Sequence, residues 1–444
     1  MAERMARNER TRDVPVLPVT FVTHYASLYG ANRSLVNLLE GLREHDVLPH
    51  VLVPRVSDAA DGLDVTHALR SRGIEVTPGP VVWWLSRRPQ RVLGQSSREY
   101  AAALVRWRRE RLNCWAQSLR ELPGFVRRFE RSALIYSNSA FTQTGAIVAA
   151  LLRRPHVWHL REFCDDDYGY TFDLGKRLSH RVIRRAEGRV AISEAIRNHY
   201  SDAAGAAPIA LIRNGIASKP EFERLRRRAE QEPSGADASR PYVFAMVGLV
   251  RPSTKGQDVA IRAFALLARD MPQVRLLIAG NGDTTAVRSL AASLGVGEKV
   301  DFWGHISDPY RAYFASDATL MCSRREGLGR VTIEAMSACR PVIGFDSAGT
   351  HELIVEEQTG LLYRQGAEEL ANCMKRLVSN RAWARQLGVN GWHVAREKYS
   401  TELCARQVHE VLRSVASRSM GAGFPRAWWR GALPARIRAP SASR

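Results

Sequence analysis

The sequence predicts an α/β protein built from two doubly wound, Rossmann-like parallel-sheet units. Its 444 residues are enough for two or three domains with complete cores. Short branched apolar runs alternate with segments of helical periodicity in both halves, which is typical of parallel sheets covered on both faces. A polar, charge-dense stretch separates the two alternating regions. We therefore expect domains at 14–216 and 241–399, a linker at 217–240 and a basic tail at 417–444.

The first half starts with an expected strand at Val16–Thr23, a glycine turn at Gly30 and a helix at Arg33–Arg43. A strand, a turn and a helix in this order can direct free backbone N–H groups toward a phosphate. Further strands are expected at Leu48–Val53, Ile74–Thr77, Leu134–Ser137, His156–His159, Val190–Ile192 and Ile209–Ile212. The helices between them are expected at Leu63–Arg72, Gly145–Leu152, Lys176–Ala186 and Glu194–Tyr200.

A long helix at Ser97–Leu122 interrupts this alternation. Its tryptophans Trp107 and Trp115 lie among several arginines, and Trp83-Trp84 precede it. Tryptophan beside arginine on an amphipathic helix is typical of a membrane interface. The same pattern also fits a helix packed on its own sheet with its arginines in water, and both interpretations stay open.

The second half repeats the strand and helix alternation from Tyr242 onward. Strands are expected at Tyr242–Val247, Arg275–Ala279, Val300–Trp303, Ala318–Cys322 and Pro341–Phe345. Helices are expected at Asp258–Arg269, Thr285–Leu294, Tyr310–Ala315 and Arg330–Ala338, and a later helix near 400–415 is expected to pack back on the first domain. Sheets of this kind bind ligands at the carboxyl ends of their strands. The residues expected at those ends are Gly248, Gly280, Gly304, Glu326 and Asp346.

The charge and composition narrow the class of protein. The net charge is +20, and only six of the 65 basic residues are lysine. Twelve arginines against four glutamates at 81–131, and six arginines without an acidic residue at 417–444, supply most of this excess. Such a localised field favours an anionic partner such as a membrane surface. A nucleic-acid partner is not expected, because the arginines cluster without a base-stacking platform or a groove-reading helix.

Other features of the sequence favour a cytoplasmic protein. No apolar run approaches the roughly 18 residues that a membrane-spanning helix needs. The first residues, 1–13, are polar and lack the apolar region of a secretory signal. The six cysteines are scattered without a Cys-x-x-Cys pair, so we expect reduced core thiols.

The most informative stretch is Ser323–Ala338, where a strand, a glycine turn and a helix follow one another. Glu326 precedes the helix and Glu334 lies inside it, and eight residues of helical rise would separate them by roughly 12 Å. This is about the span from a sugar hydroxyl across a diphosphate to a ribose, so each carboxylate could hold one end of a nucleotide-sugar. Taken alone, the spacing also fits a glutamate that favours the helix dipole and a second glutamate on a solvated face.

These motifs together resemble the retaining family-4 (group 1) glycosyltransferases of the GT-B fold, in which two Rossmann-like domains face each other across a cleft. The resemblance covers roughly 16–413 and is more specific in the second half. The residues that carry it there are Val247-Gly-Leu-Val-Arg251…Lys255-Gly256, Ile278-Ala-Gly-Asn-Gly282, Phe302-Trp-Gly304, Glu326-Gly-Leu-Gly…Glu334-Ala-Met and Gly349-Thr-His-Glu352-Leu. In the first half they are Gly30, Trp158-His159-Leu-Arg-Glu162, Ile192-Ser193 and Arg213-Asn214-Gly215.

The resemblance implies catalytic roles for four residues. Lys255 and Arg251 would neutralise the diphosphate leaving group, a role that their position after the first strand of the second half also favours. The family's arginine usually follows the glycine directly, whereas this chain has Leu249 there. Glu326 would hydrogen-bond the donor sugar. His159 resembles the family's active-site histidine, although a single histidine at a strand end is often only structural.

The donor-binding positions implied by the resemblance cluster at glycine turns. Glu334 would bind the ribose, backbone N–H groups after Glu326 would face the sugar and phosphates, and the backbone near Gly304 would line the base pocket. The full set is Gly30, Gly248, Gly304, Gly327, Leu328, Gly329, Arg330 and Glu334. Gly349 and Glu352 are expected to form a helix-start turn. No cofactor or metal is expected, and the run Asp165-Asp166-Asp167 is expected to lie near the acceptor rather than to bind a metal ion.

The predicted function is a retaining glycosyltransferase that transfers a sugar from a nucleotide-sugar donor to a hydroxyl acceptor. The acceptor is expected to be a lipid-linked saccharide in bacterial surface polysaccharide synthesis, as in O-antigen, capsule or exopolysaccharide. The protein would then work in the cytoplasm, peripherally on the inner face of the plasma membrane. The alternatives are another GT-B enzyme, such as a nucleotide-sugar epimerase or a phosphorylase, and a non-catalytic polyanion-binding protein.

Overall fold

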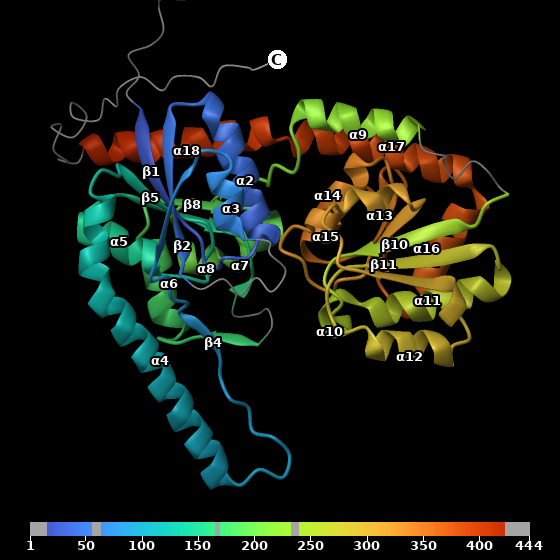
Figure 1. Cartoon of the computed structure of the whole chain (residues 1–444), viewed down its shortest axis with the longest axis horizontal. Helices are drawn as coiled ribbons and strands as arrows, with labels where there is room; N and C mark the ends of the chain where they lie inside the picture. Colours follow the sequence, from blue (N-terminus) through green and yellow to red (C-terminus); the bar gives the residue numbers. More distant parts are fainter. Residues whose placement is uncertain (1–15, 56–63, 165–168, 232–238, 422–444) are drawn as a thin grey trace, which may run out of the picture.

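The computed structural model describes residues 16–55, 64–164, 169–231 and 239–421, which form two α/β lobes (Figure 1). The first lobe contains a seven-stranded sheet and the second a six-stranded sheet. Every strand pair in both sheets is parallel. This confirms the predicted fold class of two Rossmann-like units.

The first sheet has the strand order β3-β2-β1-β5-β6-β8-β9. Its strands are β1 (Leu17–Val22), β2 (Val47–Pro54), β3 (Glu75–Gly79), β5 (Leu134–Ser137), β6 (His156–Leu160), β8 (Gly188–Ala191) and β9 (Ala210–Leu211). Its helices are α2 (Gly30–Gly41), α3 (Val65–Arg70), α5 (Thr144–Leu152), α6 (Lys176–Arg184), α7 (Glu194–His199) and α8 (Ser201–Ala204), with 3-10 turns η1 (Leu42–Glu44) and η2 (Arg127–Phe129). The central strands are buried on both faces, as their unbroken apolar runs predict.

The second sheet has the order β12-β11-β10-β13-β14-β15. Its strands are β10 (Tyr242–Val247), β11 (Val274–Ala279), β12 (Val300–Gly304), β13 (Ala318–Met321), β14 (Val342–Phe345) and β15 (Gly360–Tyr363). Its helices are α10 (Pro252–Lys255), α11 (Gln257–Asp270), α12 (Thr285–Ser293), α13 (Tyr310–Phe314), α14 (Arg330–Ser337), α15 (Ala348–Leu353) and α16 (Gly366–Ser379), with a 3-10 turn η4 (Gly297–Lys299). In both orders the first strand of the unit, β1 or β10, is third from one edge and lies where the strand order reverses, which is the place where such sheets bind ligands.

Three long helices connect the lobes: α9 (Lys219–Gln231), α17 (Arg381–Lys398) and α18 (Thr401–Gly421). Helices α9 and α17 lie together on the second lobe, while α18 returns to pack against α2 of the first (Figure 1). The sequence predicted an exposed linker helix at 217–240, but α9 buries Phe222, Leu225 and Ala229 in the core. Its spacing of three and four residues places these side chains on one face.

Helix α4 (Ser97–Val126) leaves the body of the first lobe as an arm (Figure 1). Only its last turns are buried, through Leu122 and Phe125, so it does not pack on its sheet along its length. This contradicts the second interpretation of its Trp and Arg pattern. A two-stranded antiparallel ribbon that the sequence did not predict, β4 (Leu85–Arg87) with β7 (Tyr170–Phe172), lies beside the middle of the arm.

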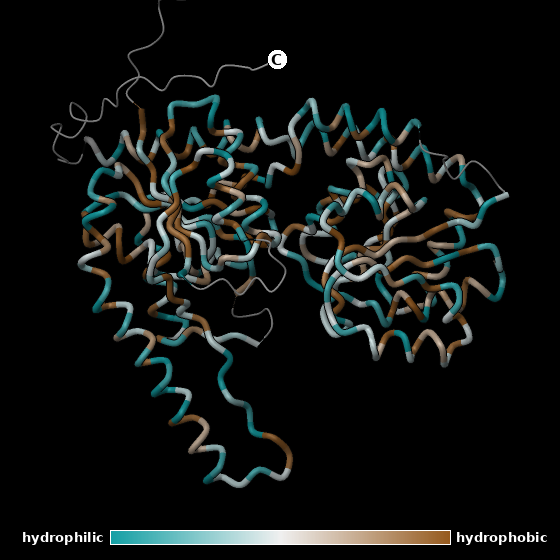
Figure 2. The backbone as a smooth tube through the Cα atoms, in the orientation of Figure 1, coloured by the Kyte–Doolittle hydropathy of each residue, from teal (hydrophilic) through white to brown (hydrophobic). Residues whose placement is uncertain are grey.

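The tip of the arm is apolar and exposed. In the loop before α4, Val92 is 67% exposed and Leu93 is fully exposed, and Figure 2 shows this stretch as hydrophobic. Among the described residues, no helix has the length and hydrophobicity that are needed to cross a bilayer.

Candidate active site between the two lobes

A cleft lies between the lobes at the carboxyl ends of both sheets. It consists of two adjoining cavities, of about 290 Å³ and about 410 Å³. The residues shared by both cavities are Gly30, Lys255, Glu326 and Arg330. Because Gly30 comes from the first lobe and the other three come from the second, both lobes are needed to form the site.

The loop between β13 and α14 brings Glu326 to Lys255. The Lys255 ammonium lies 2.6 Å from a Glu326 carboxylate oxygen, and both side chains are largely covered. Lys255 ends the short helix α10, and Gly256 follows with a φ of +71°. A Cβ at residue 256 would lie 2.4 Å from the Cys322 carbonyl oxygen, so only glycine lets α10 approach β13 this closely. The sequence assigned separate roles to this carboxylate and this ammonium, whereas the structure shows them as an ion pair.

Glu334 lies in the first turns of α14 and faces inward, with only 4% of its surface exposed. It accepts hydrogen bonds from Arg330 at 2.6 Å and from the Tyr313 hydroxyl at 3.1 Å. Burial and the nearby Glu334 carboxylate raise the pKa of Tyr313 well above its ordinary value, so the phenol stays protonated and donates. A buried carboxylate held in one orientation on the wall of a cavity can accept hydrogen bonds from a diol.

Gly329 starts α14 in the left-handed region, with a φ of +86°. This conformation directs the following residue, Arg330, along the cleft, where it pairs with Glu334 and also reaches Ser34 of α2 at 3.3 Å. The sequence listed Arg330 only for its backbone N–H. The structure shows that its guanidinium connects the two lobes and adds a cation to the cleft.

The first lobe approaches the cleft through the start of α2. A Cβ at Gly30 would meet no atom within 4 Å, because this residue faces the open space of both cavities. Any side chain here would therefore occupy the volume left for a ligand.

Close packing holds the two lobes together beside the cleft. A Cβ at Gly327 would lie 2.5 Å from the Arg161 carbonyl oxygen, and the Gly327 carbonyl accepts a hydrogen bond from Ser193. Glu352 accepts from the backbone N–H groups of Glu194 and Ala195, each at 2.8 Å, at the start of α7. Glu352 thus serves the contact between the lobes. Gly349 serves the packing within the second lobe, because its missing side chain lets α15 pack on the Glu326 loop. This agrees with the expectation that neither residue is a direct ligand.

The prediction that His159 is catalytic is wrong. Strand β6 ends at Leu160, so His159 is still inside the sheet and fully buried, and it lines neither cavity. Its Nδ1 pairs with the Tyr136 hydroxyl at 2.5 Å and with Arg161 at 3.0 Å. Burial, and secondarily Arg161, lower the pKa of His159 well below its ordinary value. A neutral imidazole without access to the cleft cannot contact a substrate.

The residues just beyond β6 reach the cleft instead. Arg161 and Glu162 both line its wall, next to Asn214 and His24. Arg161 is buried and donates to the Asn138 carbonyl at 3.0 Å and to the Asn214 side chain. The sequence contained a signal for them, because two charged residues directly after an apolar strand lie at the ligand-binding edge of a parallel sheet.

The remaining predicted site residues divide into two groups. Arg251, Gly248, Leu328 and Gly329 line the cleft. Gly304 does not, since only the residues after it, His305 and Ile306, reach the cavity. Asp346 was expected at the same edge but pairs with His351 and Arg364 outside the cleft. Gly280 lines the cleft, and a Cβ there would lie 1.8 Å from the Gly248 carbonyl oxygen.

The acidic run at 165–167, the residues before 16 and those after 421 lie outside the described part of the chain. Within the described part, no group of three His, Cys, Asp or Glu side chains is arranged to hold a metal ion. Five of the six cysteines are buried, and Cys114 is exposed on α4.

The fold resembles those of several solved proteins. Anabaena Alr3699/HepE, solved in complex with UDP-glucose, superposes with a TM-score of 0.67 at 22% identity, covering 90% of this chain and 100% of that one. Sucrose-phosphate synthase from Thermosynechococcus elongatus gives a TM-score of 0.65 at 20% identity with the same coverage. These likenesses show that the two lobes and the cleft have the GT-B fold.

Sequence comparison finds a matching protein family and several relatives. Residues 227–393 match the family model of glycosyl transferases group 1. Alpha-maltose-1-phosphate synthase of Mycolicibacterium smegmatis is 27% identical over 330 residues, which are 66% of this chain and 81% of that protein. The putative glycosyltransferase EpsD of Bacillus subtilis is 34% identical over 139 residues, only 31% of this chain and 36% of that protein.

Proposed function

We propose that this glycosyltransferase transfers a sugar from a nucleotide-sugar donor to a hydroxyl acceptor with retention of the anomeric configuration. One observation carries the proposal: the ion pairs Lys255–Glu326 and Arg330–Glu334 lie on one cleft wall, on either side of the start of α14. A nucleotide-sugar presents hydroxyls at both ends and a diphosphate between them. Carboxylates at the ends and cations between them match this pattern of donors and charge.

The donor would exchange its own groups for the internal ion pairs. Glu334 would accept hydrogen bonds from the ribose, and Glu326 from the sugar hydroxyls. Lys255 would then turn from Glu326 to the phosphate nearest the sugar, with Arg251 and Arg330 supporting the second phosphate. Cations at the diphosphate stabilise the negative charge that develops as the glycosidic bond breaks.

Retention would follow from attack on the face from which the diphosphate leaves. The acceptor hydroxyl forms the new bond to the anomeric carbon, and the departing phosphate oxygen takes the hydroxyl proton. This route needs no protein nucleophile. The first-lobe wall of the cavity, where Glu162 and His24 line the same space as Lys255, would receive the acceptor.

For the acceptor, we propose a lipid-linked saccharide of bacterial surface polysaccharide at the inner face of the plasma membrane. Among the relatives, CapM of Staphylococcus aureus is named a capsular polysaccharide biosynthesis glycosyltransferase and is 24% identical over 286 residues, 62% of this chain and 75% of that protein. The arginine-rich arm with its exposed Val92 and Leu93 supports peripheral contact with an anionic membrane.

A panel of nucleotide-sugars in a thermal-shift assay tests the donor. A donor that binds only the folded state raises the Tm in proportion to RT ln(1+[L]/Kd). NMR of the product from the stabilising donor then gives the anomeric configuration. The proposal is overturned if no nucleotide-sugar raises the Tm, or if the product is inverted.

A further inference from the structure

A second groove lies outside the donor cleft, between α4 and the β4–β7 ribbon. It encloses about 850 Å³ and is lined by residues of the arm, the ribbon and the turn before α6. Its apolar wall includes Trp107, Leu112 and Trp115 of α4 and Phe172 and Leu174 opposite them. Leu112 is 69% exposed and Leu174 is 50% exposed. Large apolar side chains left open to water on both sides of a groove indicate an apolar ligand.

The same groove is strongly basic. Four cations, Arg88, Arg108, Arg111 and Lys176, line it together with the carboxylate of Asp173. That carboxylate is 5% exposed and is bound by the Arg111 guanidinium at 2.6 and 2.8 Å. Asp173 is thus neutralised by Arg111, and Arg88 and Arg108 add positive charge to the described wall. An anionic ligand is therefore favoured.

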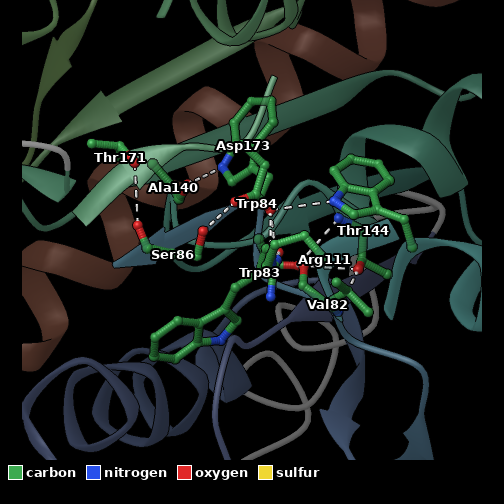
Figure 3. Close-up of polar contacts among 11 residues, drawn as sticks. Val82, Trp83, Trp84, Ser86, Arg111, Ala140, Thr144, Thr171 and Asp173 are labelled. Carbon is green, nitrogen blue, oxygen red and sulfur yellow. Dashed lines mark hydrogen bonds and ion pairs between the residues drawn. The ribbon is translucent and has the colours of Figure 1, made fainter. Parts of the chain in front are cut away.

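The Arg111–Asp173 pair also fixes the shape of the groove (Figure 3). Arg111 donates to the Trp83 carbonyl, and the Asp173 backbone N–H donates to the Trp84 carbonyl at 2.7 Å. Trp115 donates its indole N–H to Asp173 at 3.3 Å, and Ser86 also bonds this carboxylate. These contacts attach the middle of α4 to the ribbon, so hydrogen bonds and an ion pair hold the two walls of the groove in place.

The groove borders the donor cleft at one residue. Tyr170 of β7 lines both, and the Arg87 guanidinium lies 5.3 Å above its ring. Arg87 lines the cleft and the adjacent Arg88 lines the groove, so an arginine lies on each side of their common border. A ligand in the groove could extend one end past Tyr170 toward the donor.

We propose that this groove binds the lipid diphosphate of the acceptor. The isoprenoid chain lies against Trp107, Leu112 and Leu174, the phosphates pair with Arg88 and Arg108, and the saccharide reaches the cleft past Tyr170. An apolar chain with an anionic head matches the apolar wall and the charge of the groove. This inference rests on the proposed function, because only a transferase with a lipid-linked acceptor needs such a site.

Binding of farnesyl diphosphate below its micellar concentration tests the proposal, with the full chain in membrane-free buffer and isothermal titration calorimetry as the readout. The test variant is Arg108→Glu, and the matched control is Arg106→Glu, an exposed arginine two residues away that does not line the groove. We expect Arg108→Glu to weaken binding about tenfold or more, the loss typical of one hydrogen bond to a charged group. Arg106→Glu should bind within about twofold of the wild type, since only its long-range field changes.

Further arms identify which part of the probe is recognised. Farnesol and inorganic diphosphate should each bind far more weakly than farnesyl diphosphate, since each lacks one half of the match. Trp107→Ala should weaken the farnesyl probe and leave inorganic diphosphate unaffected. Equal losses in Arg106→Glu and Arg108→Glu, no loss in either, or displacement of the probe by a bound nucleotide-sugar would overturn the groove as its site.

The outcome is separable from that of the proposed function. A nucleotide-sugar should stabilise wild type, Arg108→Glu and Trp107→Ala to the same extent, which also shows that the variants fold. If the nucleotide-sugar stabilises all three proteins equally but Arg108→Glu leaves probe binding unchanged, only the groove inference fails. If no nucleotide-sugar stabilises the wild type, the proposed function fails, and the groove inference that rests on it fails too.

Discussion

Replacing Lys255 by alanine tests the cleft chemistry most directly. The Lys255 ammonium lies 2.6 Å from Glu326 in the structure, and its side chain is 26% exposed. In the proposed reaction this ammonium turns to the leaving diphosphate. A unit charge about 4 Å away at an effective dielectric constant near 20 interacts by about 4 kcal/mol. Loss of one preorganised group of this kind lowers kcat by roughly 10²–10³.

The same substitution should have little effect on stability. The Lys255–Glu326 pair is partly open to solvent, and such pairs contribute about 0–1 kcal/mol to the free energy of unfolding. The expected result is therefore a large fall in kcat with a Tm within a few degrees of the wild type. Lys255→Arg keeps the charge and should recover part of the rate.

Steady-state transfer rates with the stabilising nucleotide-sugar provide the assay. Lys375→Ala is the matched control, because Lys375 forms a 2.8 Å pair with Asp270 that is far more exposed, at 50% and 59%. The control should retain the wild-type rate. If Lys255→Ala lowered kcat by less than about tenfold, or if Lys375→Ala lowered it equally, Lys255 would not carry the leaving-group charge.

Three further predictions follow from the packing. Gly327→Ala would place a Cβ 2.5 Å from the Arg161 carbonyl, so the lobes should separate and kcat/KM should fall more than about tenfold; wild-type activity would contradict the close contact. Glu352→Ala removes the acceptor of two backbone N–H groups at the start of α7, which should weaken the interlobe contact by about 1 kcal/mol. The radius of gyration measured by small-angle scattering should then increase. An unchanged scattering profile would contradict this role of Glu352. Burial lowers the pKa of both His24 and His156 to about 3. Below pH 6.5 these two histidines therefore bind protons in the unfolded chain but stay neutral in the folded chain. Stability should therefore fall by about 2 kcal/mol per histidine between pH 6.5 and pH 5, and His156→Gln should flatten this slope in urea titrations at the two pH values.

Local patterns account for the success of the sequence analysis in the second lobe. The expected strand at Tyr242–Val247 is β10, and Arg330–Ala338 matches α14 to one residue. Arg330 and Glu334 lie four residues apart on α14, so their pairing follows from helical spacing, and Glu326 lies on the loop directly before that helix. Lys255 lies on the neighbouring strand's loop, and a parallel sheet brings such loops together at one edge.

Long-range packing explains the errors. The sequence of α4 predicts an amphipathic helix whether it lies at a membrane or on its own sheet. Only the tertiary structure shows that its apolar side faces a ribbon and not the main sheet. That ribbon, β4 with β7, has strands of three residues that lie about 85 positions apart in the chain, and so carries almost no periodicity to detect.

By itself, the sequence determined the two α/β units and the loop–helix segment with its paired glutamates, because these depend on periodicity and spacing between near neighbours. The tertiary structure decided which first-lobe side chains face the cleft. His159 precedes the end of its strand by one residue and is buried, whereas Glu162 lies two residues beyond that end and reaches the cavity. A shift of a few residues at a strand end moves a side chain from core to cleft, and only the packing of the whole sheet fixes where the strand ends.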